Sequence, residues 1–189
     1  PYDEISPGRG TEPTALAGSV LVAEDFGRAL ARLAESAVGA TASARVLSGP
    51  HGVGKSTLLA LIHAIASEPA TFSRSPHQDV RSASGLFAEL KVVPVFIDPS
   101  DDPSSDFASA VRKGFVAAAN SASRVGISAA DWDGACAAPD PADQALALLP
   151  SGVRLLLLVD GASSWIRSVE RDVARGAMGS LAVIADRAQ

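Results

Sequence analysis

The stretch GPHGVGKS, residues 49–56, decides the fold of this chain of 189 residues. Its three glycines allow the backbone to curl until successive N–H groups converge on one point, as an anion requires. Lys55 adds a positive charge that can bridge two neighbouring phosphates, and the Ser56 hydroxyl can ligate magnesium. The stretch therefore predicts a loop that binds the phosphates of a nucleotide.

The residues on either side of the loop support this interpretation. Arg45-Val46-Leu47 is a β-prone run that leads into the loop, and residues 57–67 have the composition of a largely buried helix. A helix at this place directs the positive end of its dipole at the phosphates. About 0.003 accidental matches to the four fixed positions are expected at this chain's own residue frequencies. We expect ATP with magnesium to bind through Gly49, Pro50, His51, Gly52, Val53, Gly54, Lys55, Ser56 and Thr57.

A second acidic position follows about a hundred residues later in the chain, at the end of an apolar run, as a magnesium-bound NTPase needs on the strand beside the loop. Residues 153–159 form a near-continuous apolar run that ends at Asp160. Such a run suits a central parallel strand that is covered on both faces. The Asp160 carboxylate would hold magnesium opposite the Ser56 hydroxyl, and the alternative is a structural cap at the strand end. We expect Lys55 and Asp160 to be the catalytic residues, and Ser56 and Asp160 to be the metal ligands.

The remaining sequence predicts one more strand and several helices. Residues 92–98 form the strand, and Pro94 within it removes a donor, which favours an edge position or a bulge. An amphipathic helix is expected over 23–38, and others over 104–122, 129–137, 141–149 and 164–175. Residues 68–84 are interpreted as a long loop before a short helix at 85–90. Residues 178–189 are interpreted as a helix, with a strand at 181–185 as the alternative.

With GPHGVGKS as Walker A and LLLLVD as Walker B, the chain resembles the P-loop NTPase superfamily over about residues 23–189. The strand VVPVFID between them is similar to that of the branch containing AAA-type and STAND-type ATPases, and large bacterial BREX-type anti-phage ATPases are the narrower resemblance. The resemblance implies an α/β fold, a three-layer α/β/α sandwich with a parallel sheet. We expect an arm over 1–18 and, over 19–189, the N-terminal part of a longer, truncated nucleotide-binding domain.

The chain departs from this family just after Asp160. The acids that the resemblance would place at Gly161, or at Ser163 and Ser164, are missing, and no arginine finger is evident. We therefore expect an ATPase with weak intrinsic turnover that couples ATP binding or hydrolysis to conformational work on a partner. The alternative is a nucleotide-gated regulatory module with little hydrolysis. A kinase is disfavoured because no second substrate pocket or arginine-rich lid is visible.

Further candidate residues have weaker support. Four acids gather after the strand at 92–98, where they form either a second metal or water-positioning site or a solvated loop: Asp98, Asp101, Asp102 and Asp106. The three histidines lack metal-ligand spacing, so core or surface roles are expected for them.

Composition limits the class of protein. The net charge of −5 argues against an overall basic surface for nucleic acid or anionic lipid, although a local basic patch is compatible with it. The single cysteine, Cys136, excludes an intrachain disulfide and fits a reducing compartment. No apolar stretch reaches the roughly 18 residues of a membrane span, so we expect a cytoplasmic protein, bacterial by its residue usage. The expected partners are the nucleotide and either another protein or a second copy of the chain.

Overall fold

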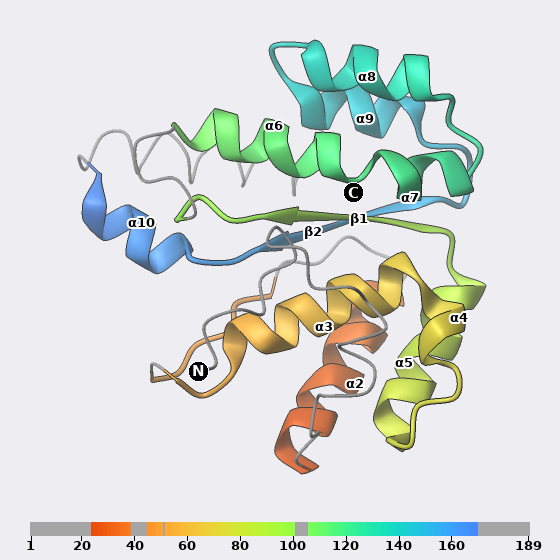
Figure 1. Cartoon of the computed structure of the whole chain (residues 1–189), viewed down its shortest axis with the longest axis vertical. Coiled ribbons are helices and arrows are strands. Elements are labelled where there is room, and N and C mark those ends of the chain that lie inside the picture. The colour runs from red at the N-terminus through yellow and green to blue at the C-terminus, as the bar shows by residue number, and fades with distance from the viewer. Residues whose placement is uncertain (1–23, 39–44, 51, 101–105, 170–189) are drawn as a thin grey trace. The chain divides into compact units, whose positions relative to one another are not determined.

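The structure is a computed structural model that describes residues 24–38, 45–50, 52–100 and 106–169 (Figure 1). The chain divides into two compact units, Pro1–Val92 and Val93–Gln189. The described part of the first unit is helical, and that of the second contains a two-stranded sheet with helices. The chain is therefore of the mixed α/β class. In the described part of the chain, no helix is long and apolar enough to cross a membrane.

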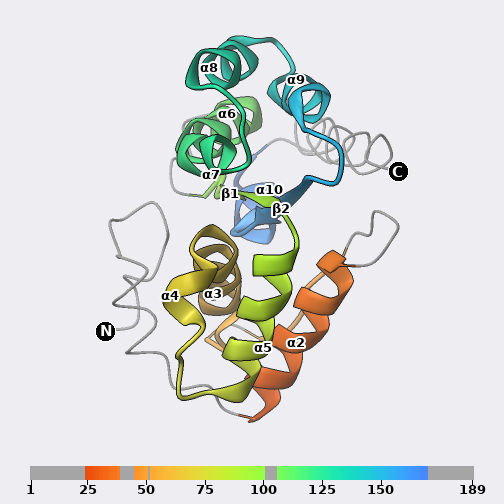
Figure 2. The ribbon, with the colours of Figure 1, turned by 90° about the vertical axis from the view of Figure 1, so that its right-hand side faces the viewer.

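Four helices pack against one another in the described part of the first unit: α2 (Glu24–Val38), α3 (Lys55–Ser67), α4 (Pro69–Phe72) and α5 (Gln78–Glu89). Figure 2 shows α2 beside α5, where Gly27 is buried and a Cβ at its position would collide with the Asp79 carboxylate. The α3 helix is apolar along most of its length and buries Leu58, Leu61, Ile62 and Ile65. The unit thus holds the predicted loop at the N-terminus of a helix fixed in a core.

The long loop predicted over residues 68–84 is wrong, because this segment forms α4 and most of α5. Val80, Ala83 and Phe87 of α5 are buried at helical spacing, so a narrow apolar face suffices to hold the helix in place. Ser84 is also buried and donates its hydroxyl hydrogen bond to the Pro69 carbonyl at 2.7 Å, which links the two helices. Packing therefore stabilises a helix in a segment whose Ser, Pro and Arg content suggested a loop.

The second unit contains two adjacent parallel strands, β1 (Val92–Ile97) and β2 (Arg154–Val159), whose connection carries four helices. These helices cover one face of the sheet (Figure 1) and are α6 (Phe107–Ala117), α7 (Ala119–Arg124), α8 (Ala129–Ala137) and α9 (Pro141–Leu148). A further helix, α10 (Ala162–Ser168), follows β2. The strands predicted at 92–98 and 153–159 and the helices predicted at 129–137 and 141–149 are confirmed, whereas the single helix predicted over 104–122 is divided at Ala118.

The core of the second unit forms where α6 lies directly on β1. Gly114 of α6 is buried, and a Cβ at its position would lie 2.5 Å from the backbone oxygen of Phe96. The buried Trp132 donates its indole N–H to the Phe115 carbonyl at 2.8 Å and packs against the Phe115 ring. This close packing of α6 on the backbone of β1 holds the strand in position near its C-terminal end.

Two strand predictions need correction. Residues 45–50 have no regular secondary structure, and Val46 is 90% exposed, so the strand predicted at 45–47 is wrong. A run of three residues forms a strand only where a neighbouring strand makes hydrogen bonds with its backbone N–H and C=O groups. The described sheet pairs β1 with β2 alone, so residues 45–47 have no such neighbour in it. The expected burial of β2 also needs correction, since Leu158 alone is buried among its residues and the others are half-buried; coverage of the sheet on both faces stays a prediction.

Other predictions have different outcomes. The position of Pro94 agrees with the predicted edge, because β1 has one neighbour in the described sheet. The arm at 1–18, the end of the helix predicted to 175 and the segment 178–189 lie outside the described residues.

Candidate functional site

The loop of residues 49–56 turns sharply into α3. Gly52 and Gly54 have φ angles of 81° and 85°, in the left-handed region that favours glycine. The Gly54 carbonyl accepts the hydrogen bond of Leu58 N at 2.9 Å and so starts the helix. No side chain caps this end of α3, and its first turn contains no acidic residue. The first N–H groups of a helix have no partner within the helix, so this end presents donors and a positive dipole to an anion.

The Lys55 side chain turns back over the loop that precedes it. Its ammonium group donates to the carbonyl oxygens of Gly49 at 2.9 Å and Pro50 at 2.7 Å. Both acceptors are neutral, so the bonds do not neutralise the charge of the ammonium. The arrangement concentrates a positive charge, a helix N-terminus and two left-handed glycines within eight residues of chain.

The predicted nucleotide-binding residues lie mostly at the surface. The exposed ones are Gly49, Pro50, Gly52, Val53 and Ser56, and the half-buried ones are Gly54, Lys55 and Thr57. His51 lies outside the described residues. The loop is therefore accessible to a ligand from solvent.

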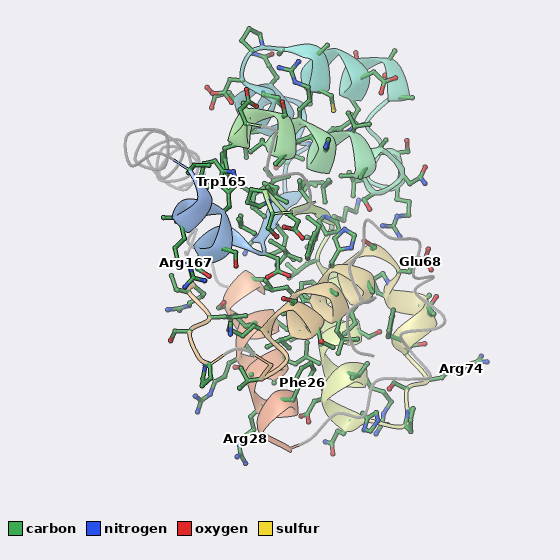
Figure 3. The ribbon with its side chains drawn as sticks, turned by 60° about the vertical axis from the view of Figure 1, so that its left-hand side comes forward. Phe26, Arg28, Glu68, Arg74, Trp165 and Arg167 are labelled. Carbon is green, nitrogen blue, oxygen red and sulfur yellow. The ribbon has the colours of Figure 1, made fainter. Side chains whose placement is uncertain are left out.

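Sequence analysis missed Phe26, which lies under the loop. A Cβ at Gly54 would lie 3.6 Å from the Phe26 ring, an ordinary van der Waals distance. Phe26 is at the start of α2, and Figure 3 shows it in the helical part of the first unit. The amphipathic pattern of α2 signalled an apolar contact at this position but could not identify Gly54 as the neighbour.

In the second unit, Asp160 follows the last residue of β2. Its backbone N–H donates to the Ile97 carbonyl at 2.9 Å, which extends the pairing of the two strands by one residue. Its carboxylate is half-buried and accepts a hydrogen bond from Gly161 N at 2.8 Å. The structure thus places Asp160 at the C-terminal edge of the sheet, where the apolar run predicts it.

The structure gives a physical reason for the missing acid after Asp160. Gly161 has a φ of 63° and precedes α10, and a Cβ at its position would lie 2.7 Å from Asp98 Oδ1 and would collide with the Ser100 hydroxyl. Asp98 Oδ1 also accepts hydrogen bonds from Ser100 N at 2.9 Å and from Ser100 Oγ at 2.6 Å. The end of β1 therefore fills the space that a side chain at position 161 would need. Asp98 and Asp160 come together at the same sheet edge, and the sequence did not indicate the part played by Ser100.

Of the other acids of the predicted cluster, the structure describes Asp106. Asp106 caps α6 by accepting from Ser109 N at 2.6 Å, and hydrogen bonding by Ser109 lowers the pKa of the Asp106 carboxyl. Asp101 and Asp102 lie outside the described residues. Over the described ranges, no three His, Cys, Asp or Glu side chains form a cluster that could hold a metal ion.

Two further side chains have packing roles. Burial in α3 lowers the pKa of His63 to about 4, so this imidazole is neutral at pH 7. Cys136 is a buried free thiol, and desolvation raises its pKa above the ordinary value. Of the core or surface roles expected for the histidines, the core role fits His63.

Comparison of the chain with protein-family models, with curated proteins and with solved structures gives no match in any of the three.

Proposed function

We propose that this chain binds Mg-ATP through residues 49–56 as a P-loop NTPase of the AAA/STAND type. The observation that carries the proposal is the conformation of the loop. Two left-handed glycines lead into an uncapped helix N-terminus, and Lys55 is folded back over the same turn. Backbone donors, a helix dipole and a lysine at one turn suit a chain of phosphates better than any single carboxylate ligand.

Each group of the loop has a distinct part in this proposal. The N–H groups of the turn and of the first turn of α3 donate to phosphate oxygens. Lys55 exchanges the carbonyls of Gly49 and Pro50 for β- and γ-phosphate oxygens, and its bonds become stronger because these acceptors are charged. The Ser56 hydroxyl and the Asp160 carboxylate would be the ligands of a magnesium ion, which would neutralise phosphate charge.

The fold proposed for this function is the three-layer α/β/α sandwich. Its support is the parallel pair β1 and β2 and the four helices that cover one face of that pair. In open parallel sheets, ligands bind beyond the carboxyl ends of the strands, and Asp98 and Asp160 stand at those ends here.

Conformational work on a partner, driven by ATP hydrolysis, is the first proposed role. A nucleotide-gated regulatory module with little hydrolysis is the second, and the crowding around Gly161 favours it, because no carboxylate fits at the position after Asp160. Steady-state turnover of the purified chain, with and without partners, separates the two roles. We expect turnover of the chain alone to be well below about 1 per second, because no group that activates water and no arginine finger is assigned. Faster turnover that Lys55→Ala abolishes would reveal a catalytic residue we have missed, and Asp98→Asn is the first variant to test for it.

Asp160→Asn is expected to weaken ATP binding severalfold in the presence of magnesium and to leave magnesium-free ATP binding nearly unchanged. The substitution removes the charge that attracts the metal but keeps the size of the side chain. Calorimetric titration with ATP, with magnesium and with a chelator, measures both affinities. Asp133→Asn is the matched control, since Asp133 is exposed on α8 in the same unit. Equal losses of affinity with and without magnesium would show that Asp160 has a structural role.

A further inference from the structure

The aromatic ring of Phe26 lies beside the turn at which the loop of residues 49–56 enters α3. A Cβ at Gly54 would lie 3.6 Å from one ring carbon and 4.0 Å from the next, so the ring borders the side of Gly54 on which other residues carry a side chain. Phe26 is half-buried and belongs to α2, which precedes the loop in the chain. The turn therefore has an apolar neighbour that is not part of the loop itself.

The helix that carries Phe26 is held by close packing within the first unit. The next residue, Gly27, is buried, and a Cβ at its position would collide with the Asp79 carboxylate of α5. Leu30 and Ala34, one and two turns further along α2, have no exposed surface. The backbone from which the Phe26 side chain projects is thus fixed, so the ring leaves Gly54 only if its rotamer changes or α2 moves.

The conformation of Gly54 needs such support from outside. Its φ of 85° lies in the left-handed region, but glycine adopts other regions about as readily, so the residue itself does not hold the turn. Among the described residues, no side chain makes a capping hydrogen bond at this end of α3. The Gly54 carbonyl accepts from Leu58 N at 2.9 Å, the bond that begins the helix. A ring that restricts Gly54 therefore keeps the N–H groups at the start of α3 pointing in one direction.

We propose that Phe26 is a positioning residue for phosphate binding, which holds the turn at Gly54 in the conformation that receives the anion. The inference rests on the proposed binding of phosphates at residues 49–56. A loop that is ordered before the ligand arrives loses less conformational entropy on binding, so the ring raises affinity through the loop without touching the ligand. Its effect is therefore the same for every ligand that carries the phosphates, whether or not a base is attached.

Hydrogen exchange of the unliganded chain tests the effect of the ring on the turn. The Leu58 amide reports this turn, because it donates to the Gly54 carbonyl. We expect Phe26→Ala to speed exchange of this amide at least about fivefold, as measured by NMR, because the turn opens more often. Leu33→Ala is the matched control and should leave the rate nearly unchanged. Leu33 is another half-buried residue of α2, two turns further along, and is not among the side chains within 4 Å of a Cβ at Gly54.

Calorimetry tests the effect of the ring on binding, with magnesium and two ligands: ATP, and inorganic tripolyphosphate, which lacks base and ribose. Phe26→Ala should lower both affinities by a similar factor of at least about five. Phe26→Tyr should restore both, because it retains the ring carbons that face Gly54. Circular dichroism checks that each variant is folded. If Phe26→Ala does not fold, Phe26→Leu replaces it, with an expected loss of at least about twofold for both ligands.

Three results would overturn this role of Phe26. One is unchanged affinity for both ligands in the folded variant. Another is a loss for ATP alone, which would place the ring against the base instead of the loop. The third is equally fast exchange of the Leu58 amide in Phe26→Ala and Leu33→Ala, which would reveal a general loosening of α2. Failure of the unchanged chain to bind either ligand would disprove the proposed phosphate loop and this inference with it, whereas the three results leave the phosphate loop standing.

Discussion

Lys55→Ala should reduce the affinity of the chain for Mg-ATP at least about tenfold, which corresponds to about 1.4 kcal/mol or more. The substitution removes the positive charge that would face the β- and γ-phosphates. It also removes the two hydrogen bonds to the carbonyls of Gly49 and Pro50, so the loop loses the contact that tightens its turn. The fold should be retained, because the core of α3 consists of apolar residues that follow Lys55 in the helix. Calorimetry with the folded variant measures the change in affinity.

The control for this experiment is Lys91→Ala. Lys91 is exposed and lies just before β1, so its removal changes the net charge by the same amount without altering the loop. A folded Lys55→Ala variant with the affinity of the unchanged chain would disprove the proposed phosphate loop. An equal loss in both variants would show that the effect arises from net charge alone.

Gly114→Ala should lower the free energy of unfolding of the second unit by about 2 to 3 kcal/mol. The added Cβ would lie 2.5 Å from the Phe96 carbonyl oxygen, which is a backbone atom and cannot rotate away. Helix α6 must therefore separate from β1, and contacts of Phe115 and Val111 in the core weaken with it. The gain in helix propensity from Gly to Ala, about 1 kcal/mol, offsets only part of this cost.

Tryptophan fluorescence measures this change during unfolding by urea. The two tryptophans of the chain, Trp132 and Trp165, are both buried in the second unit, so their emission reports that unit. Gly134→Ala is the matched control, because Gly134 is exposed on α8 and a Cβ there meets no atom within 4 Å. We expect the control to be stabilised by up to about 1 kcal/mol. Equal stability of the two variants would contradict the close packing of α6 on β1.

The sequence predicted the local elements of the fold well where periodicity and caps agree. The helix at 129–137 begins and ends as predicted, because Ser128 caps it and its apolar residues face the core. The short helix predicted at 85–90 is the end of α5, but the residues 78–84 that begin this helix were predicted as loop, because polar residues surround a narrow face made by Val80, Ala83 and Phe87. The strand at 45–47 was predicted from β propensity alone, and propensity does not supply a ladder partner.

The candidate site shows the same division between local and distant effects. Loop residues 49–56 are adjacent in sequence, so their residue types alone predict the turn and its donors. The environment of Asp160 depends on Ser100, which is 60 positions away and becomes a neighbour only because the two strands pair. No pattern in a single sequence identifies which residue fills the space beside Gly161. The missing acid could be noticed from the sequence, but its steric cause could not.

The contacts of Lys55 also determine which anions can compete for the loop. The carbonyls of Gly49 and Pro50 occupy two of the three N–H donors of the ammonium, at 2.9 and 2.7 Å, so an incoming anion gains those two donors only in exchange for these bonds. A halide is a single atom and accepts its hydrogen bonds at one point. A chain of phosphates has oxygens enough to accept from the ammonium and from the N–H groups of the turn at separate points. If the loop binds phosphates as proposed, we expect it to favour ligands with several linked anionic groups over the small anions of the surrounding solution.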